Sequence, residues 1–385
     1  MRRFLPYSTQ SIDEDDVRAV VEALRSPLIT QGPRLSEFER ALADYCGAKY
    51  AVCFSSGTAA LHAAYFALGL GEGDEFITTP ITFVATSSAG LFLGARPLFA
   101  DVEPDTGNMD PESLRKRITP GVKLVSVVHY GGHPARMREI REVADSLGAR
   151  VVEDACHALG ARYMGERVGC CRFSDAAVFS FHPVKHITTA EGGAVLTNDE
   201  EVYERLLMFR NHGITRDPSR FLYEPHGGWY YEVQFLGFNY RMSELQAALG
   251  LSQLKKSEAF LKKRRELAAL YGRLLRSVDG VSPPVEKDYA CSSYHLYPIR
   301  LNGPYASKKE ELFGLLREAG LGVQVHYIPV YWHPLYRRLG YPRGLCPEAE
   351  RFYERVLSIP LHPSMDRGDV EYVVDVVDKA LRRLL

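Results

Sequence analysis

Residues 176–197 read AAVFSFHPVKHITTAEGGAVLT, two short apolar runs separated by a loop that carries Lys185. The runs 176–181 and 193–197 have the length and composition of buried strands. A lysine between two buried strands is unusual, because loop lysines are otherwise nearly always at the surface. Burial and a nearby cation would lower its pKa and leave more neutral amine to attack an aldehyde. The stretch therefore predicts a buried sheet with a candidate nucleophilic amine at its edge.

On the N-terminal side, short apolar runs alternate with helical patterns. We expect strands at 50–54, 75–79, 124–128 and 150–153, and helices at 57–68, 85–93 and 137–147. This alternation is typical of a mainly parallel α/β sheet. Residues 213–241 break the rhythm, since they are rich in aromatic residues and glycine and have no apolar period. Such long irregular stretches are often functional.

Further elements are expected at both ends of the chain. Ser11 and Glu14 have the spacing of a capping box, followed by a helix with Val17, Val20, Val21 and Leu24 on one face. After residue 241 we expect helices at 242–254, 257–275, 306–319 and 370–384, strands at 295–301 and 322–327, and a boundary at Pro283-Pro284. The predicted domains are 1–254, an N-terminal arm with the large domain, and 255–385, a linking helix with a small α+β domain.

The composition favours a small-molecule partner over nucleic acid or an acidic membrane. The chain has 385 residues and a formal net charge of −1, so it lacks the basic footprint of a nucleic-acid binder. Its seven cysteines show neither paired spacing nor a secreted framework, and no metal site is expected. Residues 1–7 are not followed by an apolar signal region, and no run of 18 apolar residues occurs. These features predict a cytoplasmic protein with reduced thiols.

Residues 55–60, SSGTAA, join a strand to an alanine-rich helix. Backbone N–H groups and the helix dipole converge at such a junction, so a phosphate could bind there. A plain small-residue turn for tight packing explains the sequence equally well. The dinucleotide fingerprint GxGxxG is missing from every strand-to-helix junction, which disfavours a nicotinamide-dependent oxidoreductase.

Residues 153–157, EDACH, end an apolar strand with acidic side chains. The carboxyl ends of parallel strands open on the ligand crevice, where Asp154 could hold a pyridine nitrogen protonated and make the ring an electron sink. Asp154 could equally cap a helix. His157 could bond the phenolic oxygen of such a cofactor or be a satisfied core histidine.

Six segments, in this order, resemble the DegT/DnrJ/EryC1/StrS family of pyridoxal-phosphate (PLP) sugar-nucleotide aminotransferases. They are 28–32 (LITQG), 56–61 (SGTAAL), 79–86 (TPITFVAT), 153–154 (ED), 180–193 and 237–242 (GFNYRM). The resemblance implies the aspartate aminotransferase fold, fold type I. This fold has a large domain with a mainly parallel seven-stranded sheet and a smaller C-terminal α+β domain.

The family also implies roles for individual residues. Lys185 matches the lysine that holds PLP as a Schiff base, and Asp154 matches the partner of the ring nitrogen. The other implied cofactor contacts are Phe83 on the ring, Gly57, Thr58 and Ser180 at the phosphate, and Asn239 from a second subunit. The implied nucleotide-sugar pocket comprises Tyr7, Pro27, Leu28, Ile29, Thr30, Gly57, Ser180, Arg241, Gln324, Val325, His326 and Tyr327.

Segments 180–185, 187–193, 211–217, 247–256 and 324–327 look like one branch of the family. That branch acts in pseudaminic acid biosynthesis, and it aminates UDP-2-acetamido-2,6-dideoxy-β-L-arabino-hex-4-ulose, a UDP-linked 4-keto-6-deoxy-N-acetylhexosamine. The resemblance therefore implies PLP, L-glutamate as donor and a homodimer with shared active sites. A relative with histidine at the lysine position dehydrates its substrate, so Lys185 favours transamination. A bacillosamine-type or perosamine-type product, or a PLP-fold regulator without turnover, stays open.

Overall fold

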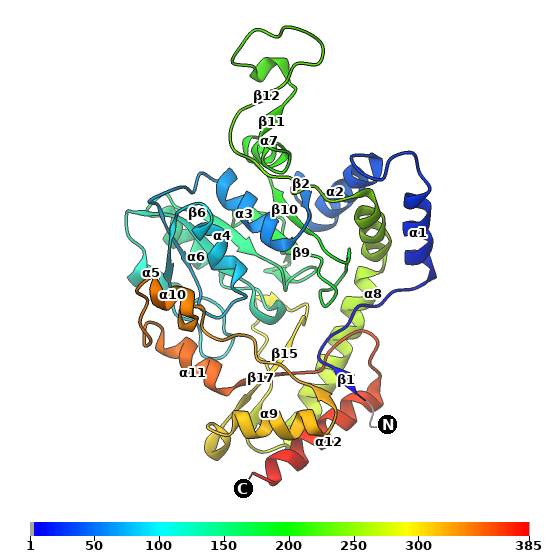
Figure 1. The fold of residues 1–385 in the computed structure, drawn as a ribbon. Coiled ribbons are helices and arrows are strands. Elements are labelled where there is room, and N and C mark those ends of the chain that lie inside the picture. Colours follow the sequence, from blue (N-terminus) through cyan, green and yellow to red (C-terminus); the bar gives the residue numbers. More distant parts are fainter. Residues whose placement is uncertain (1–3, 385) are drawn as a thin grey trace.

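The structure, a computed structural model, describes residues 4–384 and contains two sheet-based regions (Figure 1). Residues 1 and 385, the outer limits of the two expected domains, lie outside the described part. The larger region is a seven-stranded sheet in the order β2-β10-β9-β6-β5-β3-β4. Its strands are β2 (Tyr50–Phe54), β3 (Glu75–Thr78), β4 (Arg96–Phe99), β5 (Val122–Val128), β6 (Arg150–Asp154), β9 (Ala176–Ser180) and β10 (Gly193–Thr197).

Only β10 in this sheet runs antiparallel to its neighbours, so the expected α/β class with a mainly parallel seven-stranded sheet is confirmed. The sequence patterns predicted six of the seven strands. They missed β4, which is four residues long and contains Pro97. The strand lies at the edge of the sheet, where a proline is tolerated because one side of the strand needs no hydrogen bonds.

Helices cover both faces of the sheet, because successive side chains along each strand point to opposite sides. Val152 and Val178 pack toward one face with α3 (Gly57–Ala67), α4 (Ala85–Leu91) and α7 (Glu200–Phe209). Val151 packs toward the other face with α5 (Pro111–Arg117) and α6 (Met137–Asp145), and Phe179 packs there with α2 (Pro33–Cys46). Asp154 and Ser180 each follow by two residues a strand residue that points to the α3–α4 face, so both project toward that face.

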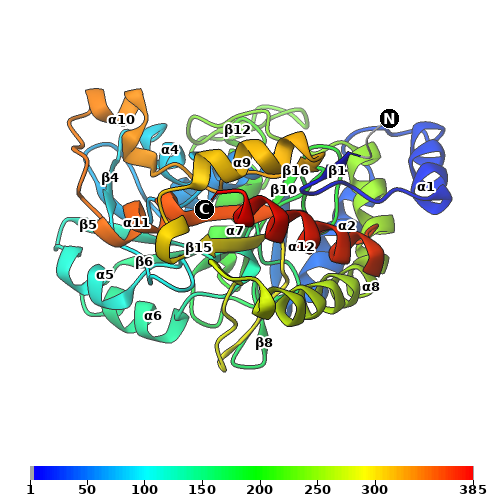
Figure 2. The same cartoon turned by 90° about the horizontal axis from the view of Figure 1, so that it is seen from below.

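The smaller region is built on an antiparallel sheet of β13 (Val281–Ser282), β15 (Tyr297–Leu301) and β17 (Val356–Ile359). It packs on α9 (Lys309–Glu318) and α12 (Arg367–Arg382), which lie together on one side of it (Figure 2). β1 (Leu5–Pro6) pairs with β16 (Leu321–Gly322), so the N-terminal segment also reaches this region. The remaining elements are β7 (Arg162–Tyr163), β8 (Glu166–Arg167), β14 (Ala290–Cys291), α10 (Pro334–Arg338), α11 (Pro347–Arg355), and the 3₁₀ turns η1 (Tyr130–Gly132), η3 (Leu275–Ser277), η4 (Gly303–Tyr305) and η5 (Val330–Trp332).

Three element predictions were wrong. The strand expected at 322–327 is shorter than predicted, because β16 ends at Gly322. Gln324 then makes an isolated antiparallel bridge with Ser358 of β17, and residues 324–327 line a cavity. The first helix, α1 (Glu14–Leu24), has its capping box between Asp13 and Asp16 and not between Ser11 and Glu14. The apolar residues Val17, Val21 and Leu24 of α1 are exposed. The buried Asp16 instead contacts Gln253 and Lys256 further along the chain.

The two helices expected at 242–254 and 257–275 are one helix, α8 (Glu244–Leu274), which the figure shows passing beside both regions (Figure 1). Its Ala247 and Leu254 pack in the core under the large sheet, and its Leu267 and Tyr271 pack in the core of the smaller region. The apolar face of α8 therefore packs on one core before residues 255–258 and on the other core after them. These four residues are polar and interrupt the apolar pattern, so the sequence suggested two helices, although neither glycine nor proline occurs there. The domain limits themselves stay a prediction.

Within residues 213–241, the segment from residue 214 to residue 233 forms an arm that projects from the body, whereas residues 235–241 return to it, where Phe235, Phe238 and Tyr240 pack against the core (Figure 1). The arm contains β11 (Ile214–Thr215), β12 (Glu232–Val233) and the turn η2 (Pro218–Arg220). A Cβ at Gly213, which has φ +71, would lie 1.9 Å from the Phe235 carbonyl oxygen, so the base of the arm requires glycine. Trp229 and Leu236 are 73% and 83% exposed. Within residues 4–384, no helix combines the length and apolar character needed to cross a membrane.

Candidate active site

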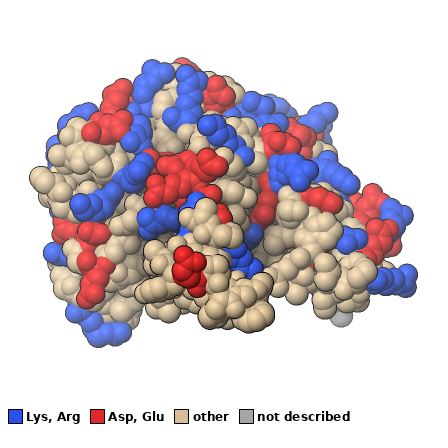
Figure 3. Space-filling model, turned by 90° about the horizontal axis from the view of Figure 1, so that it is seen from above, with Lys and Arg blue, Asp and Glu red and all other residues tan. Residues whose placement is uncertain are grey.

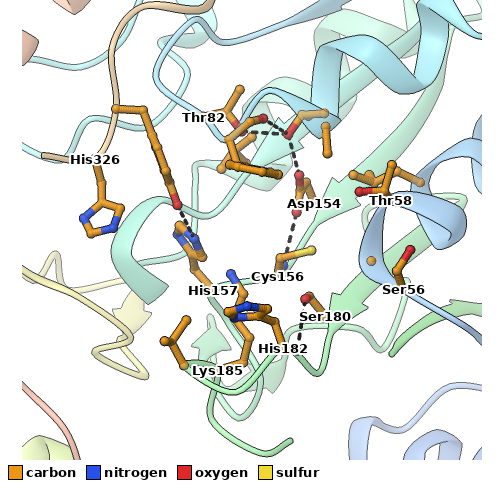
Figure 4. Close-up of a pocket in the computed structure, with 18 of the residues that line it drawn as sticks. Ser56, Thr58, Thr82, Asp154, Cys156, His157, Ser180, His182, Lys185 and His326 are labelled. Atoms are coloured by element: carbon orange, nitrogen blue, oxygen red, sulfur yellow. Dashed lines mark hydrogen bonds between the residues drawn. The ribbon is translucent and has the colours of Figure 1, made fainter. Parts of the chain in front are cut away.

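A cavity of about 690 Å³ opens at the carboxyl ends of β6 and β9, where open α/β sheets bind ligands (Figure 4). The N-terminus of α3, the start of α4 and residues 324–327 from the smaller region complete its wall. It brings together many of the residues predicted from the sequence. These are Tyr7, Gly57, Thr58, Phe83, Asp154, His157, Ser180, Lys185, Gln324, Val325, His326 and Tyr327.

Asp154 is buried and its carboxylate is fixed by two donors. Thr86 Oγ1 donates to Oδ2 over 2.6 Å, and the backbone N–H of Cys156 donates to Oδ1 over 3.2 Å. No helix begins in the described chain directly after Asp154, so the helix-cap interpretation is not supported. An ionised carboxylate held in this way can accept a further hydrogen bond from a protonated ring nitrogen.

Lys185 lies on the loop between β9 and β10 and extends toward the cavity beside His157 (Figure 4). Burial lowers the pKa of its amine, against the opposing influence of Cys156 and Asp154. Its two neighbours tie the loop to distant parts of the chain. Ser8 Oγ donates to the Val184 carbonyl oxygen over 3.0 Å, and His186 Nε2 lies 3.2 Å from the Ser293 carbonyl oxygen. The Lys185 amine is thus presented to the cavity from a backbone that is held on both sides.

The turn before α3 forms an anion site. Ser56 caps the helix by accepting from the Ala59 N–H, whereas the N–H groups of Gly57 and Thr58 belong to the helix's first turn, which has no intrahelical acceptors. A Cβ at Gly57 would lie 2.9 Å from the Ser180 Cβ, so only glycine lets the helix approach β9 this closely. These N–H groups, the Ser180 hydroxyl and the helix dipole favour a phosphate.

Two rings define the middle of the cavity. Phe83 is 58% exposed and presents its ring to the space, with the Tyr327 ring centroid 6.3 Å away. His157 Nε2 lies 3.0 Å from the Tyr327 hydroxyl, while its buried Nδ1 has no partner. Burial holds the pKa of His157 well below its ordinary value, so the ring is neutral.

This set of residues fits pyridoxal phosphate. The Asp154 carboxylate can face the pyridine nitrogen, the Lys185 amine can reach the aldehyde, and the N-terminus of α3 can bind the phosphate. Phe83 offers a face for the ring, and the unpartnered Nδ1 shows that the pocket around His157 has an unused polar site. Asp154, Lys185, Gly57, Thr58, Ser180 and Phe83 are therefore the residues that would hold the cofactor.

The other predicted residues lie outside the cavity. Pro27, Leu28, Ile29 and Thr30 are exposed, and so is Asn239, which follows the arm. Arg241 bridges to Phe54 beside the phosphate turn, and its Nη1 donates to Asn211 Oδ1 over 2.6 Å. The roles expected for these residues stay predictions, and exposure in a single chain is compatible with a site completed by a second one.

Sequence reasoning missed several residues that line the cavity. They are Ser56, Leu61, Thr82, Ala85, Thr86, Val128, Cys156, His182, Val184 and Glu191. No local pattern could have found the threonines, because Thr82 precedes α4 and only Thr86 belongs to it. The contact of Thr86 with Asp154 depends on packing between α4 and β6.

Comparison with known proteins agrees with this geometry. Residues 10–378 match the model of the DegT/DnrJ/EryC1/StrS aminotransferase family. A relative from Campylobacter jejuni, named UDP-4-amino-4,6-dideoxy-N-acetyl-beta-L-altrosamine transaminase, is 40% identical over 99% of this chain and 98% of its own. The spore coat polysaccharide biosynthesis protein SpsC of Bacillus subtilis is 39% identical over 97% of this chain and 96% of its own.

A solved structure is also closely similar. Helicobacter pylori PseC, described as an aminotransferase involved in the biosynthesis of pseudoaminic acid, superposes with a TM-score of 0.91 at 37% identity. The match covers 99% of this chain and 100% of PseC.

Proposed function

The chain belongs to the DegT/DnrJ/EryC1/StrS aminotransferase family and is a PLP-dependent aminotransferase, and from this we propose its substrates. The acceptor is UDP-2-acetamido-2,6-dideoxy-β-L-arabino-hex-4-ulose, the donor is L-glutamate, and the product is the 4-amino sugar of the pseudaminic acid pathway. The transaminase from Campylobacter jejuni and PseC from Helicobacter pylori support this choice of sugar. The observation that carries the proposal is that Lys185, Asp154 and the α3 N-terminus face one cavity.

Lys185 performs the proton transfers. When bound, PLP supplies an aldehyde that carries the amino group between substrates and a ring that withdraws electrons from the reacting carbon. The Lys185 Nζ removes the proton from Cα of the amino donor and later delivers a proton to C4 of the sugar. Its lowered pKa favours the neutral amine that the first transfer needs.

Other residues orient the reactants. Asp154 accepts a hydrogen bond from the protonated ring nitrogen, and the α3 N-terminus with Ser180 binds the phosphate. Tyr7, Gln324, Val325, His326 and Tyr327 lie on the side of the cavity formed by the N-terminal segment and the smaller region, where the sugar would enter. Tyr327 also hydrogen-bonds His157, so it links the sugar side to the cofactor side.

The working enzyme is a cytoplasmic homodimer in which each chain completes the other's site. Exposed apolar residues, Trp229 on the arm and Leu236 after it, and the exposed Asn239 support this assembly. The face from which the arm projects carries interspersed acidic and basic side chains (Figure 3). This mixed charge supports small-molecule substrates over nucleic acid.

An assay with defined sugars tests the proposal. The purified protein is incubated with L-glutamate and UDP-linked 4-keto-6-deoxy-N-acetylhexosamines of both C5 configurations, and products are identified by NMR. We expect amination of the β-L-arabino sugar with formation of 2-oxoglutarate. Amination of only the other C5 configuration would contradict the choice of sugar, and no conversion of L-glutamate would contradict the donor.

The alternative acceptor is the 4-keto sugar of a bacillosamine-type product. The same assay separates it, because such an enzyme would aminate the UDP-linked sugar of the other C5 configuration.

A further inference from the structure

One backbone turn holds two groups that face the cofactor site. Phe83 presents its ring to the cavity, and three residues later the Thr86 N–H donates to the Phe83 carbonyl oxygen over 3.2 Å. From the same turn, Thr86 Oγ1 reaches Asp154 Oδ2 over 2.6 Å and lies 2.7 Å from Thr82 Oγ1 (Figure 4). Thr82, Thr86 and Asp154 are only 3%, 0% and 5% exposed. Little of each side chain is therefore accessible, although all three border the cavity.

The backbone of Thr86 is held from behind by a buried tyrosine. Tyr65 on α3 is 0% exposed, and its hydroxyl lies 2.8 Å from the Thr86 carbonyl oxygen and 2.7 Å from Ser126 Oγ on β5. Residues of α3, α4, β5 and β6 thus meet at one point. Because this packing is close, the Thr86 hydroxyl has little freedom to turn away from Asp154.

The number of protons sets the direction of the hydrogen bonds. An ionised carboxylate only accepts. Thr86 Oγ1 has two such acceptors in reach, Asp154 Oδ2 at 2.6 Å and the Phe83 carbonyl oxygen at 3.2 Å, and the nearer, charged one takes its hydroxyl proton. Thr82 then has to donate to Thr86, which gives the ordered chain Thr82 to Thr86 to Asp154. A hydrogen bond to a charged group is shorter and stronger than a neutral one, and the 2.6 Å distance is in this class.

We infer that Thr86, supported by Thr82, is a positioning residue that holds the Asp154 carboxylate aimed at the ring nitrogen of PLP. The inference rests on the proposed role of Asp154 and adds the hydrogen bonds that hold its carboxylate in place. The Cys156 N–H holds Oδ1 and Thr86 holds Oδ2, so the plane of the carboxylate is fixed. Phe83 belongs to the same turn as Thr86. The turn therefore positions both the side chain that would stack on the PLP ring and the hydroxyl that holds Asp154 toward the ring nitrogen.

Four variants test this inference. Thr86→Val keeps the shape but removes the hydroxyl, Thr86→Ser keeps the hydroxyl, and Thr82→Val removes only the second donor. The matched control is Thr78→Val on β3, because Thr78 is equally buried and its hydroxyl has no partner. For each variant we would measure the PLP dissociation constant of the apoprotein, the pH dependence of the cofactor absorbance, the rate with L-glutamate and the thermal midpoint.

We expect Thr86→Val to bind PLP more weakly and to shift the pH dependence of the cofactor absorbance. Its reaction with L-glutamate should be about 10- to 100-fold slower, because the free energy of a hydrogen bond to a charged group corresponds to a rate change of this size. Thr82→Val should show a smaller change of the same kind. Thr86→Ser should recover most of the rate, and Thr78→Val should match the parent protein.

The inference is overturned if Thr86→Val behaves like Thr78→Val, or if serine restores the thermal midpoint but not the absorbance. If Thr86→Val does not fold, Thr82→Val decides, and a parent-like absorbance profile there overturns the inference. Asp154→Asn is measured in parallel. Parent-like rate and absorbance in that variant would contradict the proposed role of Asp154, whereas a severe loss there with a parent-like Thr86→Val would contradict only the positioning role.

Discussion

At the scale of single residues, the site depends on an amine and a carboxylate that share a cavity but have opposite requirements. Burial lowers the pKa of Lys185 and so favours its neutral form. Asp154 is buried, and two hydrogen-bond donors hold its carboxylate. The amine and the carboxylate therefore reach the same cavity with different surroundings, each suited to its proposed task.

Replacing Lys185 with alanine should abolish most turnover. A positioned proton-transfer group typically contributes ~10²–10⁴-fold, and the variant also loses the covalent bond to the cofactor. Single-turnover rates with L-glutamate measure the loss, and borohydride reduction with peptide mapping should place the cofactor on Lys185 in the parent protein. Lys255→Ala, an exposed lysine on α8, is the control and should remain fully active. Retained turnover in Lys185→Ala would refute the assignment.

Sequence reasoning reached Lys185 and Asp154 because each follows a recognisable buried strand, and strand ends in α/β sheets meet at the ligand. His157 could not be assigned from sequence, since only packing shows that its Nδ1 is buried without a partner. Thr86 was missed for the same reason. Its importance comes from the carboxylate of a strand 68 positions later in the chain.

At the scale of elements, α1 is held on the body by a charged contact. Asp16 Oδ2 lies 2.6 Å from Lys256 Nζ and 2.7 Å from Gln253 Nε2, both on α8, and the Asp16 side chain is fully buried. Among the apolar residues of α1, Ala23 is buried, whereas Val17, Val21 and Leu24 are exposed. The contact at Asp16 is therefore an important part of the attachment of this helix.

Lys256→Ala should destabilise the protein by about 3 kcal/mol, because it leaves the buried Asp16 carboxylate without its cation. Urea unfolding measures the change. Lys379→Ala, which removes an exposed pair with Asp375, should cost at most about 0.5 kcal/mol. If the two variants have equal effects, the contact at Asp16 does not hold the helix.

The bounds of the buried strands were predicted to within a few residues, since continuous apolar runs mark them directly. Helix ends were predicted less well where two nearby polar residues could each serve as the N-cap. Asp13 caps α1 in place of Ser11, two residues earlier, because both side chains can accept from a first-turn N–H. Likewise, the strand expected at 322–327 has suitable residues, but after Gly322 only Gln324 pairs, with Ser358, and residues 325–327 line the cavity.

At the scale of the whole molecule, acid should destabilise the folded chain through its buried histidines. Burial lowers the pKa of His62, His133 and His362 to about 4 and that of His326 to about 3. In the unfolded chain these groups take up protons below about pH 6.5, and the native state does not until a much lower pH. Their contribution to stability is complete above that pH and is lost as the pH falls from about 6.5 toward 4.

Urea midpoints at pH 7, 6 and 5, at constant protein concentration, should therefore decrease in that order. His62→Phe should reduce the slope, because His62 packs against Phe92, Phe209 and Phe238 and lies outside the cavity. Midpoints that stay constant or rise on acidification would contradict this account.

The proposed dimer predicts that sedimentation velocity finds a species of twice the chain mass. Trp229→Asp combined with Leu236→Asp should weaken it, because both side chains are largely exposed in the single chain and would become charged. The loss of dimer should reduce activity in parallel if Asn239 acts across the interface. A fully active monomer would refute the shared site.

The uninterrupted course of α8 limits how substrates can enter. A rotation of one region against the other would have to bend a helix of 31 residues whose two ends are embedded in different cores. Wide opening of the whole protein is therefore costly, and admission of a bulky nucleotide sugar must rely on local displacement of short segments such as the one around Tyr7. Turnover should accordingly respond more to changes in those segments than to changes that stiffen the long helix.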